Sequence, residues 1–152
     1  MIAIGADHAG FQYKEEIREY LESRGLQVKD FGTFSENSVD YCDFAIAVGE
    51  AVASGECDKG ILFCGTGVGM SISVNKVKGI RAVVCSEPFS ARMARLHNDS
   101  NVLAMGSRVV GIELAKMILD IWLETNFEGG RHKRRVDKMM EYDNKRECGE
   151  KS

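Results

Sequence analysis

A cysteine followed by a glycine-rich turn is the part of this 152-residue sequence that most directly suggests chemistry. Cys64 ends the apolar run at residues 60–63, and Gly65-Thr66-Gly67-Val68-Gly69 follows it. The pattern predicts a buried strand, a tight turn and a helix over residues 68–75. A cysteine in this position lies beside unpaired backbone N–H groups and the positive end of a helix dipole, and both favour thiolate over thiol.

The same loop can hold an anion, because glycine-bordered N–H groups at a helix start bind negative charge. A base beside an anion cradle suits proton transfer on a substrate that passes through an oxyanion. The loop is neither a dinucleotide fingerprint, whose third glycine comes one place later, nor a P-loop, which needs Gly-Lys-Ser/Thr. The loop alone leaves open a plain strand-to-helix turn with a buried cysteine.

Polar side chains also follow other predicted strands. Asp7 and His8 follow the first, Asp40 and Tyr41 come after the second, and Arg108 comes after the last. Ligands of open parallel sheets bind beyond the carboxyl ends of the strands, so these groups should gather at one edge. Singly, Asp7 could be a helix cap, His8 a surface imidazole and Arg108 half of an ion pair. Their convergence favours a binding site.

Two further pairs carry side chains of interest near helix ends. His97 and Asn98 end a predicted helix, where a protonated histidine could equally satisfy the last carbonyl groups. Arg131 and Arg135 are four residues apart, share one face if helical, and could grip a phosphate. A solvated basic face is the alternative for these arginines.

Short apolar runs alternate with helical patterns along the chain. Five runs are predicted strands, at residues 1–4, 26–31, 60–63, 80–84 and 102–104. Between them, apolar residues recur at helical spacing, with glycines at helix ends and Pro88 at a helix start. This alternation predicts an α/β fold with a five-stranded parallel sheet covered by helices on both faces.

The C-terminal third suggests assembly. The segment at residues 112–123 is apolar nearly all round, and such a helix must be buried on more than one side. We therefore expect a homo-oligomer. A basic segment at residues 131–135 opens a charged helical tail, which we expect to be used in oligomerisation. We predict one domain over residues 1–146 and a disordered tail at residues 147–152.

Composition narrows the function classes. Apolar residues make up 44% and charged residues 28% of the chain, as in soluble globular proteins, and the net charge of -3 disfavours a nucleic-acid partner. Five cysteines without a Cys-x-x-Cys pair favour neither a zinc site nor a disulfide framework. No signal peptide and no apolar run of membrane-spanning length is evident, so we expect a cytoplasmic protein without membrane contact.

Taken together, these motifs resemble the B-type ribose-5-phosphate isomerases, a family that also includes allose-6-phosphate and galactose-6-phosphate isomerases. The resemblance covers residues 1 to about 136 and rests on these segments in order: residues 7–10, 32–33, 40–41, 64–69, 75–76, 79–82, 97–98, 106–108 and 128–132. It implies a Rossmann-like three-layer domain, a homodimer or a pair of such dimers, and active sites shared between subunits. The implied reaction is aldose–ketose isomerisation through an enediolate without metal or cofactor.

The resemblance also implies roles for individual residues. Cys64 is the base that moves a proton between C1 and C2, and His97, with Asp7 nearby, donates the proton that opens the furanose ring. Thr66 and the loop backbone hold the enediolate oxygens. The implied phosphate ligands are His8, Arg108, Arg131 and Arg135. The other substrate contacts are Asp7, His8, Tyr41, Gly65, Thr66, Gly67, Val68, Gly69 and Asn98.

Two positions bear on the branch of the family. Some members lack the cysteine and use a glutamate at the end of the loop, but here that position is Met70, which cannot act as a base. Cys42 stands where proline is common. The expected substrate pair is ribose 5-phosphate and ribulose 5-phosphate, of the pentose phosphate pathway. The alternatives are another sugar phosphate such as allose 6-phosphate, a non-catalytic phosphosugar-binding module, and a nucleic-acid binder that uses residues 131–135.

Overall fold

The computed structural model describes residues 1–145, which form five strands and six helices. The strands are β1 (Ile2–Ala6), β2 (Val28–Asp30), β3 (Lys59–Cys64), β4 (Ala82–Val84) and β5 (Val102–Gly106). The helices are α1 (Phe11–Ser23), α2 (Tyr41–Ala53), α3 (Val68–Val74), α4 (Pro88–Asn98), α5 (Ile112–Glu124) and α6 (Arg131–Lys145). Residues 147–152, the predicted disordered tail, lie outside the described residues.

All strand pairs are parallel, in the order β2-β1-β3-β5-β4. The predicted five-stranded parallel sheet is therefore confirmed. Strand β3 lies at the centre, and its register sets Phe63 opposite Ala6 of β1 and Cys64 opposite Gly106 of β5. The loops that follow β1, β3 and β5 consequently leave the sheet side by side.

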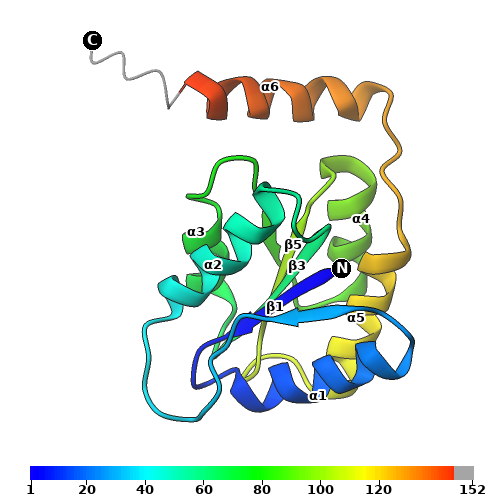
Figure 1. The fold of residues 1–152 in the computed structure, drawn as a ribbon. Helices are drawn as coiled ribbons and strands as arrows, with labels where there is room; N and C mark the ends of the chain where they lie inside the picture. Colours follow the sequence, from blue (N-terminus) through cyan, green and yellow to red (C-terminus); the bar gives the residue numbers. More distant parts are fainter. Residues whose placement is uncertain (146–152) are drawn as a thin grey trace.

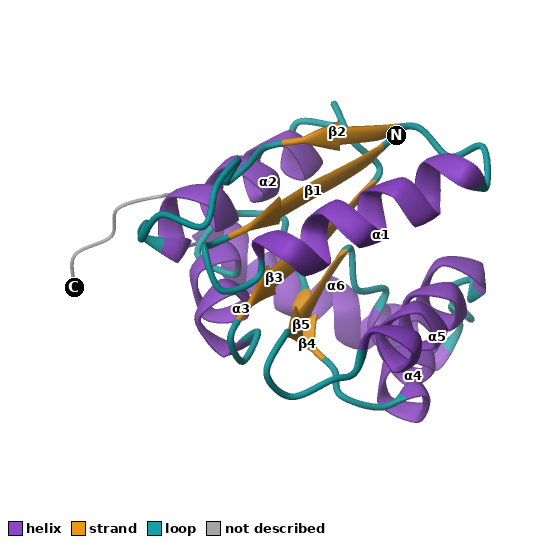
Figure 2. Ribbon diagram, turned by 90° about the horizontal axis from the view of Figure 1, so that it is seen from below, coloured by secondary structure: helices purple, strands orange, loops and turns teal. Residues whose placement is uncertain are grey.

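Helices cover both faces of the sheet. Successive side chains along a strand point to opposite faces, so each strand contributes to two cores. Ile61 and Phe63 belong to the core under α1 and α5, whereas Leu62 and Cys64 belong to the core under α2 and α3. Figure 2 shows α1, α4 and α5 on one side of the strands and α2 and α3 on the other. The architecture is the expected three-layer α/β arrangement.

The fourth strand starts two residues later than predicted. Gly79 has a φ of 86°, Ile80 donates its N–H to Val77, and Arg81 donates its N–H to the Asn101 side chain at 2.8 Å. Residues 79–81 therefore form a turn held by a side chain. The apolar pattern extended the strand because Ile80 is buried, although it does not join the ladder.

Helix α5 finds its second cover largely within the chain. Ala115, Ile118, Leu119 and Trp122 are fully buried, and α4 packs along α5. On the other flank, Asp120 accepts a hydrogen bond from the hydroxyl of Tyr20 on α1 at 2.7 Å. One face of this helix is thus covered within the chain, whereas Leu114 and Met117 are 38% and 55% exposed, and the homo-oligomer stays an expectation.

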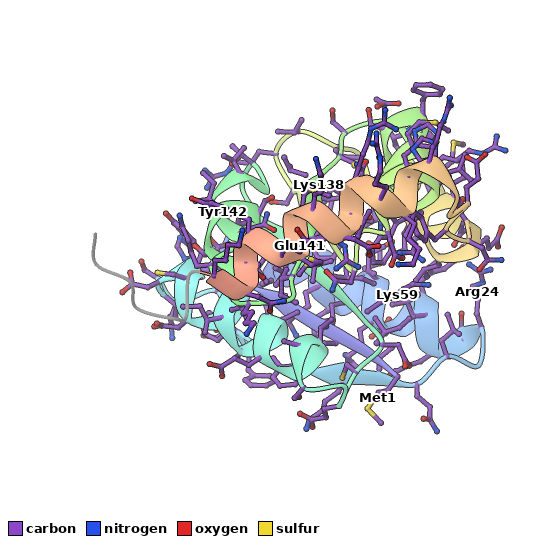
Figure 3. The ribbon with its side chains drawn as sticks, turned by 90° about the horizontal axis from the view of Figure 1, so that it is seen from above. Met1, Arg24, Lys59, Lys138, Glu141 and Tyr142 are labelled. Carbon is purple, nitrogen blue, oxygen red and sulfur yellow. The ribbon has the colours of Figure 1, made fainter. Side chains whose placement is uncertain are left out.

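Helix α6 lies across one end of the molecule, joined to α5 by an extended segment (Figure 1). It packs on α4, and its buried side chains are His132 and Val136. Figure 3 shows α6 from above, with the exposed side chains of Lys138, Glu141 and Tyr142 along it. Among residues 1–145, no helix is long and apolar enough to cross a membrane.

Candidate active site

Cys64 ends β3, and the glycine loop holds its sulfur. The side chain is 5% exposed, and Sγ accepts the backbone N–H of Gly67 at 3.0 Å. Gly67 has a φ of 78°, and a Cβ there would lie 2.8 Å from the carbonyl carbon of Met105. Glycine is therefore required at this position for both conformation and space. The predicted helix start is confirmed, since α3 begins directly after Gly67.

The loop that follows β5 holds the glycine loop after Cys64 in place by hydrogen bonds. Ser107 and Arg108 donate their backbone N–H groups to the carbonyls of Cys64 and Gly65, at 2.9 and 3.0 Å. The Arg108 side chain lies over Gly65, where a Cβ would be 3.3 Å from its Nη1. The Ser107 hydroxyl donates to the carbonyl of Ala9 at 2.7 Å and so ties the loops together. Ser107 belongs to the motif at residues 106–108, but the sequence alone indicated no role for it.

The loop after β1 completes this side of the site. The buried Asp7 carboxylate accepts the N–H groups of Ala9 and Gly10, at 2.9 and 3.0 Å. His8 accepts the N–H of Val39 on Nδ1 at 3.2 Å, so its neutral ring carries its proton on Nε2. Asp7 therefore shapes the turn before α1, but it is not the helix cap, because the N-cap residue is Gly10. Its backbone N–H donates to the carbonyl of Phe63, next to Cys64, at 3.1 Å.

Tyr41 and Gly69 form a matched pair at the edge of this cluster. Tyr41 begins α2, and its ring lies against Gly69 so closely that a Cβ there would be 2.8 Å from two ring carbons. The third glycine of the loop is thus needed because an aromatic side chain occupies the space. Thr66 is exposed beside it, and its Oγ1 accepts the N–H of Val68 at 3.3 Å.

His97, Asn98, Arg131 and Arg135 lie at the opposite edge of the sheet. Helix α4 runs back against the strand direction, and Asn101, just beyond it, accepts the N–H of Gly60 at the start of β3. Gly60 and Cys64 are four steps apart along the strand, about 13 Å. Figure 3 shows α6 over the side of the molecule where Met1 and Lys59 lie, before β1 and at the start of β3. The structure therefore divides the predicted site residues into two groups.

The second group contains a histidine pair. The rings of His97 and His132 stack with centroids 4.0 Å apart and planes 9° apart. A Glu128 carboxylate oxygen lies 3.8 Å from Nε2 of His97 and 3.6 Å from Nε2 of His132. Burial is the main cause of a lowered pKa of His132, and the neighbouring His97 and Arg131 lower this pKa further. Glu128 and His132 belong to the motif at residues 128–132, but the sequence gave them no role because their proximity to His97 is tertiary.

A buried cysteine in a glycine loop, at the carboxyl edge of a parallel sheet covered on both faces, defines a Rossmann-like α/β protein with a candidate ligand site at that edge. A family model described as Ribose/Galactose Isomerase matches residues 2–139. The chain belongs to this family and is therefore an isomerase. The resemblance seen in the sequence is confirmed at the level of the family.

Individual relatives agree with this assignment. The chain is 58% identical over 145 residues to ribose-5-phosphate isomerase B of Escherichia coli strain K12, covering 95% of this chain and 97% of the relative. It is 45% identical over 144 residues to D-erythrulose-4-phosphate isomerase of Pectobacterium atrosepticum, covering 93% and 94%. The family thus includes relatives named for sugar phosphates of different length.

Solved structures match over nearly the whole chain. Ribose-5-phosphate isomerase B of Clostridium thermocellum superposes with a TM-score of 0.94 at 56% identity, covering 95% of this chain and 98% of that one. The Mycoplasma genitalium enzyme, solved with bound ribulose 5-phosphate, gives a TM-score of 0.90 at 41% identity, covering 94% and 95%. These likenesses confirm the fold.

Proposed function

We propose that this protein interconverts D-ribose 5-phosphate and D-ribulose 5-phosphate through a cis-enediolate, with the Cys64 thiolate as the base. The observation that carries the proposal is the position of Sγ, at the carboxyl edge of β3 inside a loop of backbone N–H groups. The relatives named for ribose 5-phosphate support the substrate. The same role was expected from the sequence.

The proposed proton transfer needs both parts of the loop. The thiolate takes the proton from C2 of the open-chain aldose and returns it to C1, while the hydroxyl proton on O2 passes to O1. Negative charge builds on oxygen in between. N–H groups in the first turn of α3 have no partner within the helix and would stabilise that charge. One such donor typically contributes about 3 kcal/mol to the transition state.

The complete site would require a second copy of the chain. Ring opening by His97 and phosphate binding by Arg131 and Arg135 cannot serve the Cys64 loop of the same copy, because these residues stand at the other edge of the sheet. We propose a homodimer in which each copy sets this group over the partner's loop. Val68 and Ile72 of α3 are 46% and 59% exposed beside the loop, an apolar surface that a second copy would cover.

The direct test is conversion of ribose 5-phosphate by the purified protein, with a chelator present and Cys64→Ala measured in parallel. We expect chelator-resistant activity in the wild type and a loss of several orders of magnitude in the variant, with native circular dichroism in both. Activity retained by a well-folded Cys64→Ala protein would remove the thiolate from the mechanism.

A second candidate is isomerisation of a different sugar phosphate. The Pectobacterium relative named D-erythrulose-4-phosphate isomerase supports a four-carbon substrate, and allose 6-phosphate would be the six-carbon case. Four-, five- and six-carbon phosphates compared by kcat/KM would separate them, and we expect the five-carbon pair to lead. Family membership disfavours a non-catalytic binding module.

We also place the protein in the cytoplasm. The cysteines at positions 42, 57, 64 and 85 are free in the structure, which suits a reducing compartment. A thiolate base would keep its function there, because reduced thiol is the form that ionises. Fractionation of cells that express the tagged protein would test this placement.

A further inference from the structure

We propose that His97, Glu128 and His132 form a binding site for Zn²⁺ or a similar transition-metal ion, and that the bound ion inhibits the enzyme. The binding part stands on the geometry of these three residues alone. The inhibition part rests on the proposed role of His97 as the acid of ring opening.

The three side chains already converge. Their ligand atoms all lie within 4.8 Å of one another, and Glu128 is 3.8 and 3.6 Å from the two histidine nitrogens. Zn–N distances of about 2.0–2.1 Å place neighbouring ligands of a tetrahedral ion about 3.4 Å apart. The two Glu–His separations therefore need to close by only a few tenths of an ångström.

The chain brings these residues together through an unusual local path. Glu128 donates its N–H to the carbonyl of Leu96 at 3.0 Å, which fixes it beside the end of α4. Gly129 and Gly130 follow with φ values of 74° and 55°, which fold the backbone back into the start of α6. His132, 8% exposed, is thereby held against His97. The end of α4 supplies one ligand, and the stretch from Glu128 to His132 supplies the other two.

Two imidazoles and one carboxylate are a donor set that binds zinc with one position left open. The stacked rings are not yet in the bound arrangement, because a metal ion must lie near the plane of each ring. One ring has to turn about its Cβ–Cγ bond, and the His97 side chain, 35% exposed, has room to do so. Arg131, whose Nε donates to Nε2 of His132 at 3.4 Å, must also move away from that nitrogen.

These rearrangements suit a reversible inhibitor better than a permanent structural ion. With its Nε2 bonded to metal, His97 can no longer hold or release a proton there. Ring opening of the cyclic aldose would then fail, whereas proton transfer by Cys64 on an acyclic substrate would remain. Ribulose 5-phosphate has no free hydroxyl at C5 to close a furanose ring, so inhibition should be stronger when the reaction starts from ribose 5-phosphate.

Binding is tested by Co²⁺ absorption on the purified full-length protein, followed by displacement with Zn²⁺. We expect d–d bands without sulfur-to-metal charge transfer, and affinity weakened at least about tenfold in Glu128→Gln and in His132→Asn, since even outer-shell partners of a metal site contribute about 10–100-fold. Glu124→Gln, an exposed carboxylate paired with Arg24, is the matched control and should bind as wild type. A charge-transfer band, or unchanged affinity in exposed Glu128→Gln, would overturn the site.

Measuring the effect of Zn²⁺ on enzyme activity tests inhibition separately from metal binding. Zn²⁺ should inhibit the wild type, a chelator should restore it, and Glu128→Gln should resist. Co²⁺ binding that is lost in Glu128→Gln, combined with no Zn²⁺ effect on ribose 5-phosphate turnover, would overturn the inhibition and the ring-opening role of His97 while leaving the metal site intact.

Discussion

Subunit complementation is the sharpest consequence of the divided site. Cys64 and His97 lie at opposite ends of the sheet, separated by at least the four strand steps from Gly60 to Cys64, about 13 Å, far beyond a hydrogen bond. If each active site takes Cys64 from one copy and His97 from the other, two inactive variants can repair each other. The experiment therefore mixes the Cys64→Ala and His97→Asn proteins and measures the activity that the mixture recovers.

The size of the recovery follows from a two-fold dimer. Equal amounts that exchange at random give half mixed dimers, and each mixed dimer carries one site with both native residues and one with neither. Activity should therefore return to about a quarter of the wild-type value per subunit. Co-refolding from denaturant, followed by the ribose 5-phosphate assay, measures it.

The matched control pairs Cys64→Ala with Arg108→Ala. Both residues belong to the same edge, and Arg108 lies against the Cys64 loop of its own chain. No mixed dimer then contains an intact site, so this mixture should stay inactive. Equal recovery in both mixtures, or no recovery with His97→Asn despite proven subunit exchange, would refute the shared site.

Three further outcomes are expected. Gly69→Ala should displace the ring of Tyr41 and raise KM more than it lowers kcat, read from steady-state kinetics on a protein with an unchanged melting temperature. Burial raises the pKa of Cys85 to about 11, so Cys85 should resist iodoacetamide in native protein at pH 8 and react only after unfolding, as judged by peptide mass spectrometry. The lowered pKa of His132 means that the unfolded chain binds a proton at this residue more readily, so its contribution to stability is present above pH about 6.5 and is lost as pH falls through its folded pKa. The protection factors of the α6 amides, which are corrected for the intrinsic pH dependence of exchange, should then fall, and protection factors that do not change with pH would contradict this.

Much of the cysteine loop was predictable because its signals are local. The run ending at Cys64 and the glycines after it predict a strand, a tight turn and a helix start without reference to the rest of the chain. The structure adds that Gly67 has a φ of 78° and that a Cβ there would meet Met105, a contact that the sequence does not reveal. The roles given to Cys64 and His97 remain predictions.

The element ends were less predictable where side chains decide them. Ile80 extends the apolar run at residues 82–84, yet the N–H of Arg81 is donated to the Asn101 side chain and the strand ladder begins only at Ala82. The apolar stripe of α5 likewise gave no indication of which neighbour covers it. The structure covers one face of this helix with the chain itself and leaves Leu114 and Met117 exposed.

The sequence by itself determined the parallel α/β class and the cysteine loop, because apolar periodicity and glycine spacing are properties of short segments. It indicated the family through the resemblance of its ordered motifs, which the family model matches over residues 2–139. Only the tertiary structure decided the strand order, in which β5 lies between β3 and β4 and brings Ser107 and Arg108 against Cys64. The tertiary structure likewise places His97, Glu128 and His132 at the amino edge of the sheet. Helix α4 runs antiparallel to the strands, so it ends where β5 begins. That direction is invisible in any single motif.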